Sequence, residues 1–300
     1  MRVHFLNCVS TCPLGGLLMD GESKRLRGRL TCTSLLVERP QGLILIDTGF
    51  GTRDVVEPRS RLSPFFLGLL RPELREEMTA LRQVEALGFA RDDVRDIVLT
   101  HLDFDHAGGL DDFPEARVHL MRKERDAALT QDTWLDRQRY RPQQWSRRDK
   151  WIPYTAGEGE PWFDFDAVRQ LHGLPPEILL VPLIGHTLGH TGVAVSVGER
   201  WLLNAGDAYF FHREVDVRSP RCPPGLGLYQ TMMEKNRAAR LWNQKRLRDL
   251  RRDHPGEIEV FCSHDVKEFE RHAGRPATRP AGRWGAGPAL ERGEGAPGAP

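Results

Sequence analysis

A short apolar segment that runs directly into a cluster of histidines and aspartates constrains this chain most. Residues 96–100 (DIVLT) have the composition of a buried strand, and His101, Asp103, Asp105 and His106 follow within six residues. Four ionisable groups this close repel one another and lose hydration unless a cation balances them. The spacing therefore predicts a metal site at a strand end, where imidazole and carboxylate suit zinc, iron or manganese. The alternative is an exposed polar loop, which the two bracketing histidines disfavour.

Three later segments place a histidine or an aspartate at the end of an expected strand, beside small residues. They are GHTLGH at 185–190, NAGD at 204–207 and CSHD at 262–265. Small residues allow the backbone to approach closely, and side chains from separate strand ends often converge on one rim of a rigid scaffold. Each segment alone is a weak signal. Together with the loop at 101–106, they indicate one metal centre.

Strand and helix patterns alternate along the chain, which predicts a layered α/β fold. Strand patterns lie at 3–9, 30–49, 96–100, 117–121, 178–183, 191–197, 200–204 and 257–261. Helical spacing lies at 72–90, 123–129 and 234–252, the last being a basic helix with Leu241, Leu247 and Leu250 expected to point inward.

Two stretches lack a clear pattern. The aromatic and Arg-rich connection at 134–162 is either a lid over a pocket or surface packing, since long connections in compact domains are often functional. Residues 273–300 are rich in Gly, Pro, Ala and Arg and have few apolar side chains. We therefore expect one domain over residues 1–272 and a disordered tail over 273–300.

In order and spacing, the motifs resemble those of the metallo-β-lactamase fold hydrolases over roughly residues 1–270. The matching pieces are DTG at 47–49, HLDFDHAGG at 101–109, GHTLGH, NAGD and SHD. The layout is most similar to the N-acyl homoserine lactonase branch. The resemblance implies an αββα sandwich with a metal centre at one edge, between its two sheets.

The resemblance also implies which side chains bind two divalent ions. One ion would be held by His101, Asp103 and His186, the other by Asp105, His106 and His264, and Asp207 would bridge both. Asp47 would orient the ligands, and His190 would be a supporting or pocket residue. Most family members have His where this chain has Asp103. This carboxylate makes the first site more negative, which favours iron or manganese there; the alternative is a variant tuned to another substrate that still binds zinc. We expect zinc at the centre, with iron and manganese as alternatives.

The implied activity is that of a metal-dependent hydrolase, in which a metal-activated hydroxide attacks a lactone, an ester or a related small acyl substrate. Asp105 would carry the proton to the leaving group. Tyr209 would donate a hydrogen bond to the oxyanion or, alternatively, be a core aromatic, and His212 would line the pocket or lie on the surface. A glyoxalase II-like thioesterase and a phosphotriesterase use the same chemistry. A nuclease, a redox protein and a non-catalytic metal-binding protein are alternatives from other classes.

Composition narrows the partners. The chain of 300 residues has 43 Lys+Arg against 42 Asp+Glu, so its bulk charge gives no reason to expect a nucleic-acid partner. No apolar run approaches the roughly 20 residues of a membrane span, and no secretory signal is evident. The five cysteines are odd in number and scattered, which favours a reducing cytoplasm. We expect a small-molecule substrate, no nucleic acid and no membrane, and the oligomeric state stays open.

Overall fold

Two six-stranded sheets form the centre of the molecule. The computed structural model describes residues 1–157 and 159–282. The first sheet has the spatial order β1 (Arg2–Asn7), β2 (Thr33–Glu38), β3 (Leu43–Ile46), β4 (Val94–Val98), β5 (Arg117–Met121) and β6 (Trp151–Tyr154). The second has the order β12 (Ile258–Phe261), β11 (Arg200–Asn204), β10 (Thr191–Val197), β9 (Ile178–Pro182), β8 (Phe165–Gln170) and β7 (Glu160–Trp162).

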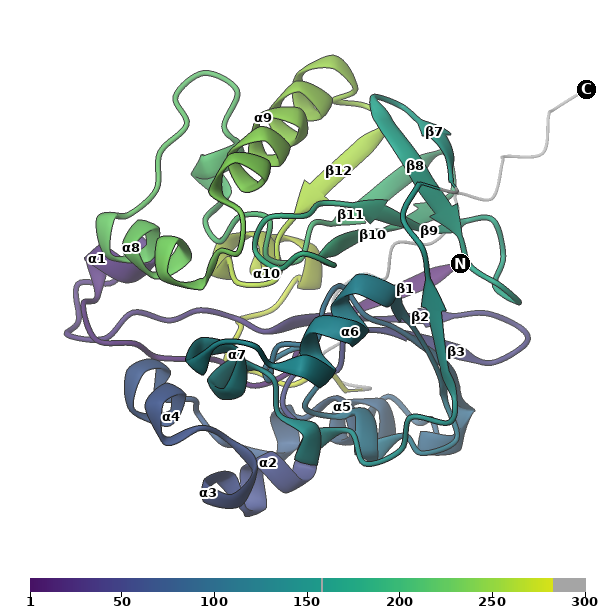
Figure 1. Ribbon diagram of the computed structural model, residues 1–300, viewed down its shortest axis with the longest axis horizontal. Helices are drawn as coiled ribbons and strands as arrows, with labels where there is room; N and C mark the ends of the chain where they lie inside the picture. The colour runs from purple at the N-terminus through teal and green to yellow at the C-terminus, as the bar shows by residue number, and fades with distance from the viewer. Residues whose placement is uncertain (158, 283–300) are drawn as a thin grey trace, which may run out of the picture.

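Helices cover the outer faces of both sheets (Figure 1). Packing against the first sheet are α5 (Ala80–Ala86) and α6 (Arg122–Thr130), and packing against β12 of the second is α9 (Arg237–Asp253). Strand β3 shows why this layering forms, since Leu45 packs toward α5 while Ile44 and Ile46 pack between the sheets. Both faces of the strand are therefore buried. This arrangement confirms the predicted αββα sandwich of metallo-β-lactamase type.

Six further helices of the described residues lie on the left of Figure 1, and α10 (Val266–Ala273) lies near its middle. They are α1 (Leu17–Asp20), α2 (Thr52–Val56), α3 (Pro58–Arg61), α4 (Pro64–Leu70), α7 (Trp134–Arg139) and α8 (Pro224–Met233). Single 3₁₀ turns occupy Glu76–Met78, Arg91–Asp93, Leu110–Asp112, Pro142–Gln144 and His212–Val215.

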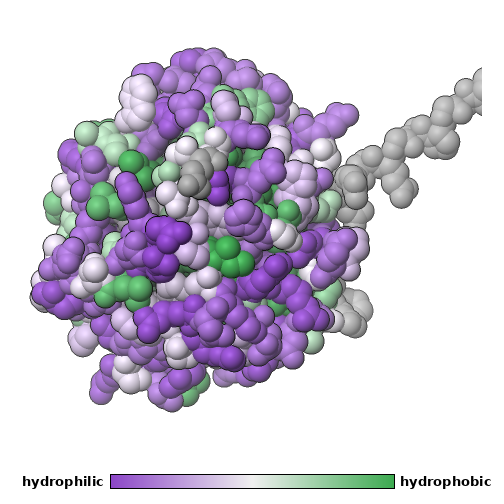
Figure 2. All heavy atoms as spheres, turned by 45° about the vertical axis from the view of Figure 1, so that its right-hand side comes forward, coloured by the Kyte–Doolittle hydropathy of each residue, from purple (hydrophilic) through white to green (hydrophobic). Residues whose placement is uncertain are grey.

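The surface is consistent with the composition. The face in Figure 2 is mostly hydrophilic, and its hydrophobic residues form small separate patches. Within the described residues, no helix is both long enough and apolar enough to cross a bilayer.

Three expectations differ from the structure. The helix expected over 72–90 is limited to α5, because the Thr79 side chain accepts a hydrogen bond from the amide of Arg82 and so begins the helix there. In α9, Leu247 and Leu250 are buried, but Leu241 is exposed.

The third difference is the domain boundary. Residues 273–282 pack on the domain instead of starting a disordered tail, because Ala277 and Ala281 are buried and the Arg275 guanidinium donates to the carbonyl of Phe5. Small apolar side chains and one long donor thus anchor a segment whose composition suggests disorder. The remainder of the expected tail, 283–300, lies outside the described residues.

Candidate metal centre

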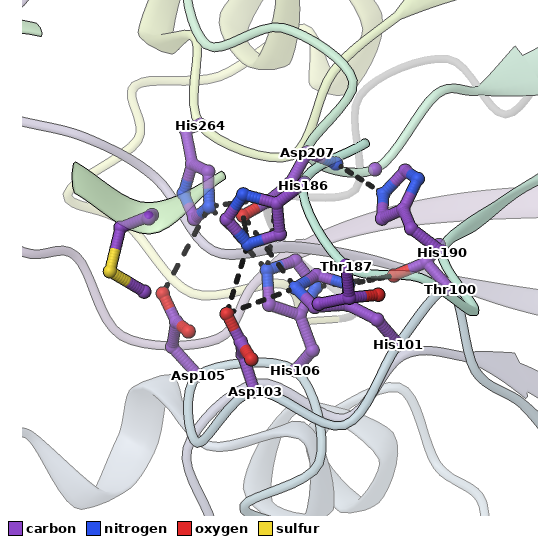
Figure 3. Close-up of polar contacts among 12 residues, drawn as sticks. Thr100, His101, Asp103, Asp105, His106, His186, Thr187, His190, Asp207 and His264 are labelled. Carbon is purple, nitrogen blue, oxygen red and sulfur yellow. Dashed lines mark hydrogen bonds and ion pairs between the residues drawn. The ribbon is translucent and has the colours of Figure 1, made fainter. Parts of the chain in front are cut away.

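The strand ends bring the predicted ligands together (Figure 3). His101 follows β4 of the first sheet, and His186, Asp207 and His264 follow β9, β11 and β12 of the second. Strands β11 and β12 are parallel, and β9 runs in their direction because both β9 and β11 pair antiparallel with β10. The carboxyl ends of these three strands therefore meet at the same edge of the second sheet, where they face the loop after β4.

Four donor atoms form what we call the first half-site. They belong to His101, Asp103, His186 and Asp207, all of them buried. His101 Nε2 lies 3.5 Å from Asp103 Oδ2 and 3.6 Å from Asp207 Oδ2. His186 Nε2 lies 3.0 Å and 3.3 Å from the same two oxygens. The predicted ligands of one ion thus point at a common centre.

The second half-site shares Asp207 with the first. Asp207 Oδ1 lies 3.2 Å from His106 Nε2 and 3.0 Å from His264 Nε2, and the two imidazole nitrogens are 3.4 Å apart. Asp105 Oδ2 lies 3.9 Å from His264 Nε2. One carboxylate therefore presents an oxygen to each half-site.

These donors fit divalent metal ions. Ligand bonds of about 2.0–2.2 Å in tetrahedral geometry place neighbouring donor atoms a little over 3 Å apart, as they are here. His101 Nε2 and Asp207 Oδ1 are buried and have no hydrogen-bond partner among residues 1–157 and 159–282. Buried polar atoms without partners are costly, and a cation would satisfy both of these.

Asp47 and Thr100 orient two of the histidines. Asp47 Oδ2 lies 2.9 Å from His106 Nδ1, and the carboxylate also accepts hydrogen bonds from the amide and the hydroxyl of Thr100, each at 2.8 Å. The Thr100 hydroxyl lies 2.9 Å from His101 Nδ1. Both imidazoles are thereby fixed through Nδ1, which leaves Nε2 facing the cluster.

His190 lies beside the cluster and contacts the backbone of Asp207. Its Nε2 accepts the amide N–H of Asp207 at 2.9 Å, and its Nδ1 lies 2.8 Å from the carbonyl of Leu183. Burial, and then the charge of His186, lower the pKa of His190 to about 3, so the ring is neutral. Gly206 allows this contact, because it has φ +55° and a Cβ there would lie 2.6 Å from His190 Nε2. His190 therefore positions Asp207, and its lone pair is not free for a metal.

Arg139, the last residue of α7, enters the first half-site although the sequence patterns gave it no role. Its Nε donates to Asp103 Oδ1 at 2.7 Å and its Nη2 to Asp103 Oδ2 at 2.5 Å. Burial favours the neutral form of Asp103, but the charge of Arg139, together with the charge of His101 and hydrogen bonds from His101 and His186, outweighs it and holds the pKa of that carboxyl well below its usual range. The sequence offers one signal for such a residue. Asp103 adds a carboxylate where most family members have His, and a buried carboxylate requires a cation nearby.

Two further buried residues support the loop. Glu124 of α6 accepts the amide of Leu102 and the hydroxyl of Thr187, and so ties the 101–106 loop to the turn that carries His186. Cys32 Sγ lies 3.9 Å from Asp105 Oδ2. Burial, and then the charge of Asp105, raise the pKa of Cys32 well above its usual value, so the thiol donates to the carboxylate.

Tyr209 does not reach the cluster, so its prediction as the oxyanion donor is wrong and the core alternative applies. It is fully buried between the second sheet and α9, and its hydroxyl donates to Glu268 at 3.0 Å.

Two other aromatic residues lie beside the second half-site. The residue after Tyr209, Phe210, stacks on His264 with ring centroids 4.7 Å apart. Tyr229 of α8 lies 5.9 Å from the Phe210 ring. Burial, and then the charges of three cluster carboxylates led by that of Asp105, raise the pKa of Tyr229 well above its usual value.

A cavity of about 280 Å³ opens beside the second half-site. His264 and Phe210 line its inner end, and Arg29, His212 and Lys267 lie along its walls. His212 is held by Asp265, whose Oδ2 lies 2.8 Å from His212 Nδ1. The cavity therefore has room for part of a small molecule next to the metal ligands.

Comparisons of the sequence with known proteins agree with this geometry. Residues 27–252 match the metallo-beta-lactamase superfamily. A probable metallo-hydrolase of Mycobacterium tuberculosis is 38% identical over 270 residues, covering 90% of this chain and 82% of that protein. An N-acyl homoserine lactonase of Bacillus thuringiensis is 32% identical over 100 residues, covering 33% of this chain and 40% of that protein.

Solved structures show the same fold. An N-acyl homoserine lactone hydrolase with N-hexanoyl-L-homoserine at its catalytic metal centre has a TM-score of 0.67 at 20% identity, covering 90% of this chain and 95% of that one. The dizinc quorum-quenching lactonase AidC has a TM-score of 0.57 at 18% identity, covering 87% and 86%. The chain therefore belongs to the metallo-beta-lactamase superfamily and is one of its metallo-hydrolases.

Proposed function

We propose that this metallo-hydrolase opens a lactone, or cleaves an ester or a related small acyl compound, at a centre for two divalent ions. The observation that carries the proposal is the buried Asp207 carboxylate shared by two histidine-containing half-sites beside a cavity. Zinc is the first choice, with iron and manganese as alternatives, since the donors are imidazole and carboxylate. When bound, such ions lower the pKa of a coordinated water toward about 7 and so supply hydroxide.

The side chains around the cavity have separate roles in this proposal. Asp105 holds and moves the proton that passes to the leaving group, since one of its oxygens lies at the edge of the second half-site and has the Cys32 thiol as a donor. We assign to Tyr229 the hydrogen-bonding role that Tyr209 cannot fill, because its ring contacts Phe210, which covers His264, and the cluster carboxylates act on its hydroxyl. Phe210 keeps water from the His264 side of the centre, because its ring covers that imidazole.

The assignment of metal ligands that the family resemblance implies is also part of the proposal. His101, Asp103 and His186 hold one ion, Asp105, His106 and His264 hold the other, and Asp207 bridges both. The relative from Bacillus thuringiensis is named a lactonase, which supports a lactone as the first substrate to test.

Substrate turnover tests the proposal. The purified chain is loaded with zinc, iron or manganese and assayed with N-acyl homoserine lactones and aryl esters, and in parallel with a thioester and a phosphotriester. We expect the lactone or the ester to be turned over fastest, and Asp207→Asn to lose that activity. Asp249→Asn, which changes a carboxylate of α9 paired with Lys245, serves as the control. Failure with every lactone and ester under all three metals would refute the proposal.

Several basic side chains of α9 are paired with carboxylates, and this favours a small-molecule substrate over nucleic acid. Lys245 and Arg252 both contact Asp249, and Arg240 contacts Glu234. Paired cations attract phosphates less than free ones do. The cytoplasm remains our proposed location, with the thiols of all five cysteines unbridged.

A further inference from the structure

The first half-site contains a cation of the protein's own. Arg139 Nη2 donates to Asp103 Oδ2 at 2.5 Å and lies 2.7 Å from His186 Nε2. These two acceptor atoms are the ones that face His101 and Asp207 in the first half-site. The guanidinium is fully buried, so water does not screen its charge.

Arg139 is held in this place from several sides. Its Nη1 donates to the carbonyl of Met233 at 2.7 Å, and its own carbonyl accepts the amide of Phe104, inside the motif loop, at 3.1 Å. The ring of Tyr140 lies 5.6 Å from the guanidinium carbon. The side chain is therefore a fixed part of the half-site, since moving it breaks hydrogen bonds to three different segments.

The contact with His186 matters most for metal binding. A neutral imidazole has one acceptor nitrogen with one lone pair, which serves either a hydrogen bond or a metal. A carboxylate such as Asp103 has several acceptor positions and can serve both partners. A metal ion at the first half-site thus has to displace Arg139 from His186 and then lie close to a positive charge.

The second half-site has no such competitor. Among the described residues, His106 and His264 make contacts through Nδ1 with Asp47 and with the carbonyl of Thr31, and no Lys or Arg is hydrogen-bonded to either. Within this described part of the chain, the polar contacts of their Nε2 atoms are with Asp207, with Asp105 and with each other. The two half-sites therefore differ in cation competition although their ligand types are alike.

We propose that Arg139 makes the centre unequal, so that the second half-site is the high-affinity metal site and the first binds its ion about 10- to 100-fold more weakly. The factor corresponds to the loss of one charge-assisted hydrogen bond. This inference rests on the metal centre of the proposed function. It adds that the charge of Arg139 balances the Asp103 carboxylate in part, as a metal ion there would. Asp103 and Arg139 therefore act together as an ion pair within the first half-site.

Metal titration tests the inference without reference to activity. The full chain is stripped with a chelator and titrated with Zn²⁺ against a chromophoric chelator, and with Co²⁺ while its visible absorption is recorded. We expect one tight equivalent and a second that is weaker by the stated factor. Two equivalents of equal affinity would overturn the inference while leaving the hydrolase proposal intact. A lack of hydrolysis with the expected unequal binding would do the reverse.

Arg139→Met removes the charge and the donors but keeps an unbranched side chain, and we expect it to bring the two affinities together. Arg61→Met is the matched control, because Arg61 is a buried arginine paired with Asp54 outside the half-sites. We expect it to leave both affinities unchanged. Circular dichroism checks that each variant is folded.

Two ligand variants locate the tight ion without changing Arg139. His264→Ala should abolish the tight equivalent, whereas His186→Ala should keep it and lose only the weak one. Loss of the tight equivalent in His186→Ala would contradict the inference even where Arg139→Met does not fold.

Discussion

Asp47 has great influence on the centre although it presents no atom to either half-site. Its carboxylate fixes the imidazole of His106 and both polar groups of Thr100, and Thr100 in turn fixes His101. One side chain therefore orients a ligand of each half-site. Its role as a support was expected from the resemblance, whereas the link through Thr100 depends on hydroxyl positions that only the folded loop defines.

We expect Asp47→Asn to weaken metal binding by about 10- to 100-fold, because the amide orients His106 less firmly and does not stabilise its ligand form as well. Competition with a chelator measures the change. Asp96→Asn breaks a similar buried pair, in which Asp96 Oδ1 lies 3.1 Å from His119 Nε2. That control should lower stability and leave metal affinity unchanged, and equal losses in both variants would contradict the prediction.

The two tyrosines should separate into a structural and a functional residue. Tyr209→Phe removes a buried hydrogen bond to Glu268 and should destabilise the fold by about 1–3 kcal/mol with kcat nearly unchanged. Tyr229→Phe should lower kcat by roughly tenfold or more with little change in stability. Urea unfolding and steady-state kinetics of both variants decide this, and the opposite pattern would restore Tyr209 as the reacting group.

Strands were predicted better than helices and connections. β3, β10 and β11 lie at or within the expected segments, because β-branched and apolar runs bounded by turn residues define a buried strand locally. The connection at 134–162 was not assigned. It contributes α7, β6 and β7, and its Tyr140 and Trp145 are buried in the core, whereas Trp134 is exposed. Which face such a segment covers depends on contacts distant in sequence.

At the start of α10, Glu268 makes stability depend on pH. Burial, followed by the nearby charge of Asp265, raises the pKa of Glu268 from 4.5 to about 7. The folded state therefore binds more protons than the unfolded state between these values, so this group's contribution to stability falls as pH rises through that window. The fall amounts to about 3 kcal/mol, at about 1.4 kcal/mol per pKa unit.

Glu268→Gln should remove this dependence, because the amide stays neutral. Relative to the unmodified chain, its free energy of unfolding should rise by up to about 3 kcal/mol between about pH 4.5 and about pH 8. Urea unfolding across that range measures the difference. Parallel stability profiles of the two proteins would show that Glu268 does not titrate in this way.

For the molecule as a whole, the centre joins the two sheets. His101, Asp103, Asp105 and His106 come from the loop after β4 of the first sheet, while the other proposed ligands follow strands of the second. The resemblance to the family implied which side chains are the seven proposed ligands, and their motifs could be located from the sequence because they lie at strand ends. Arg139 and Tyr229 could not, because each arrives from a helix far along the chain whose path no local pattern determines.

Metal removal should therefore destabilise the entire domain. At a free metal concentration a thousand times Kd, binding stabilises the folded state by about 4 kcal/mol. For a chain of this size, with an unfolding entropy of about 2 cal/mol/K per residue, that corresponds to a rise in Tm of roughly 7 °C. Calorimetry with excess Zn²⁺ and with a chelator measures the difference. Asp207→Asn should abolish most of the response, and an unchanged Tm in the unmodified chain would argue against a metal shared between the sheets.

The layer of apolar side chains between the sheets also has a consequence for ion choice. Val98 precedes the first group of donors, Phe261 precedes His264, and both side chains belong to the inter-sheet core. The thickness of that layer sets how far apart the two groups of donors stand. Ions of different radius can thus be accommodated by a slightly wider or narrower core, so that evolution has a way to retune metal preference while every coordinating residue stays the same.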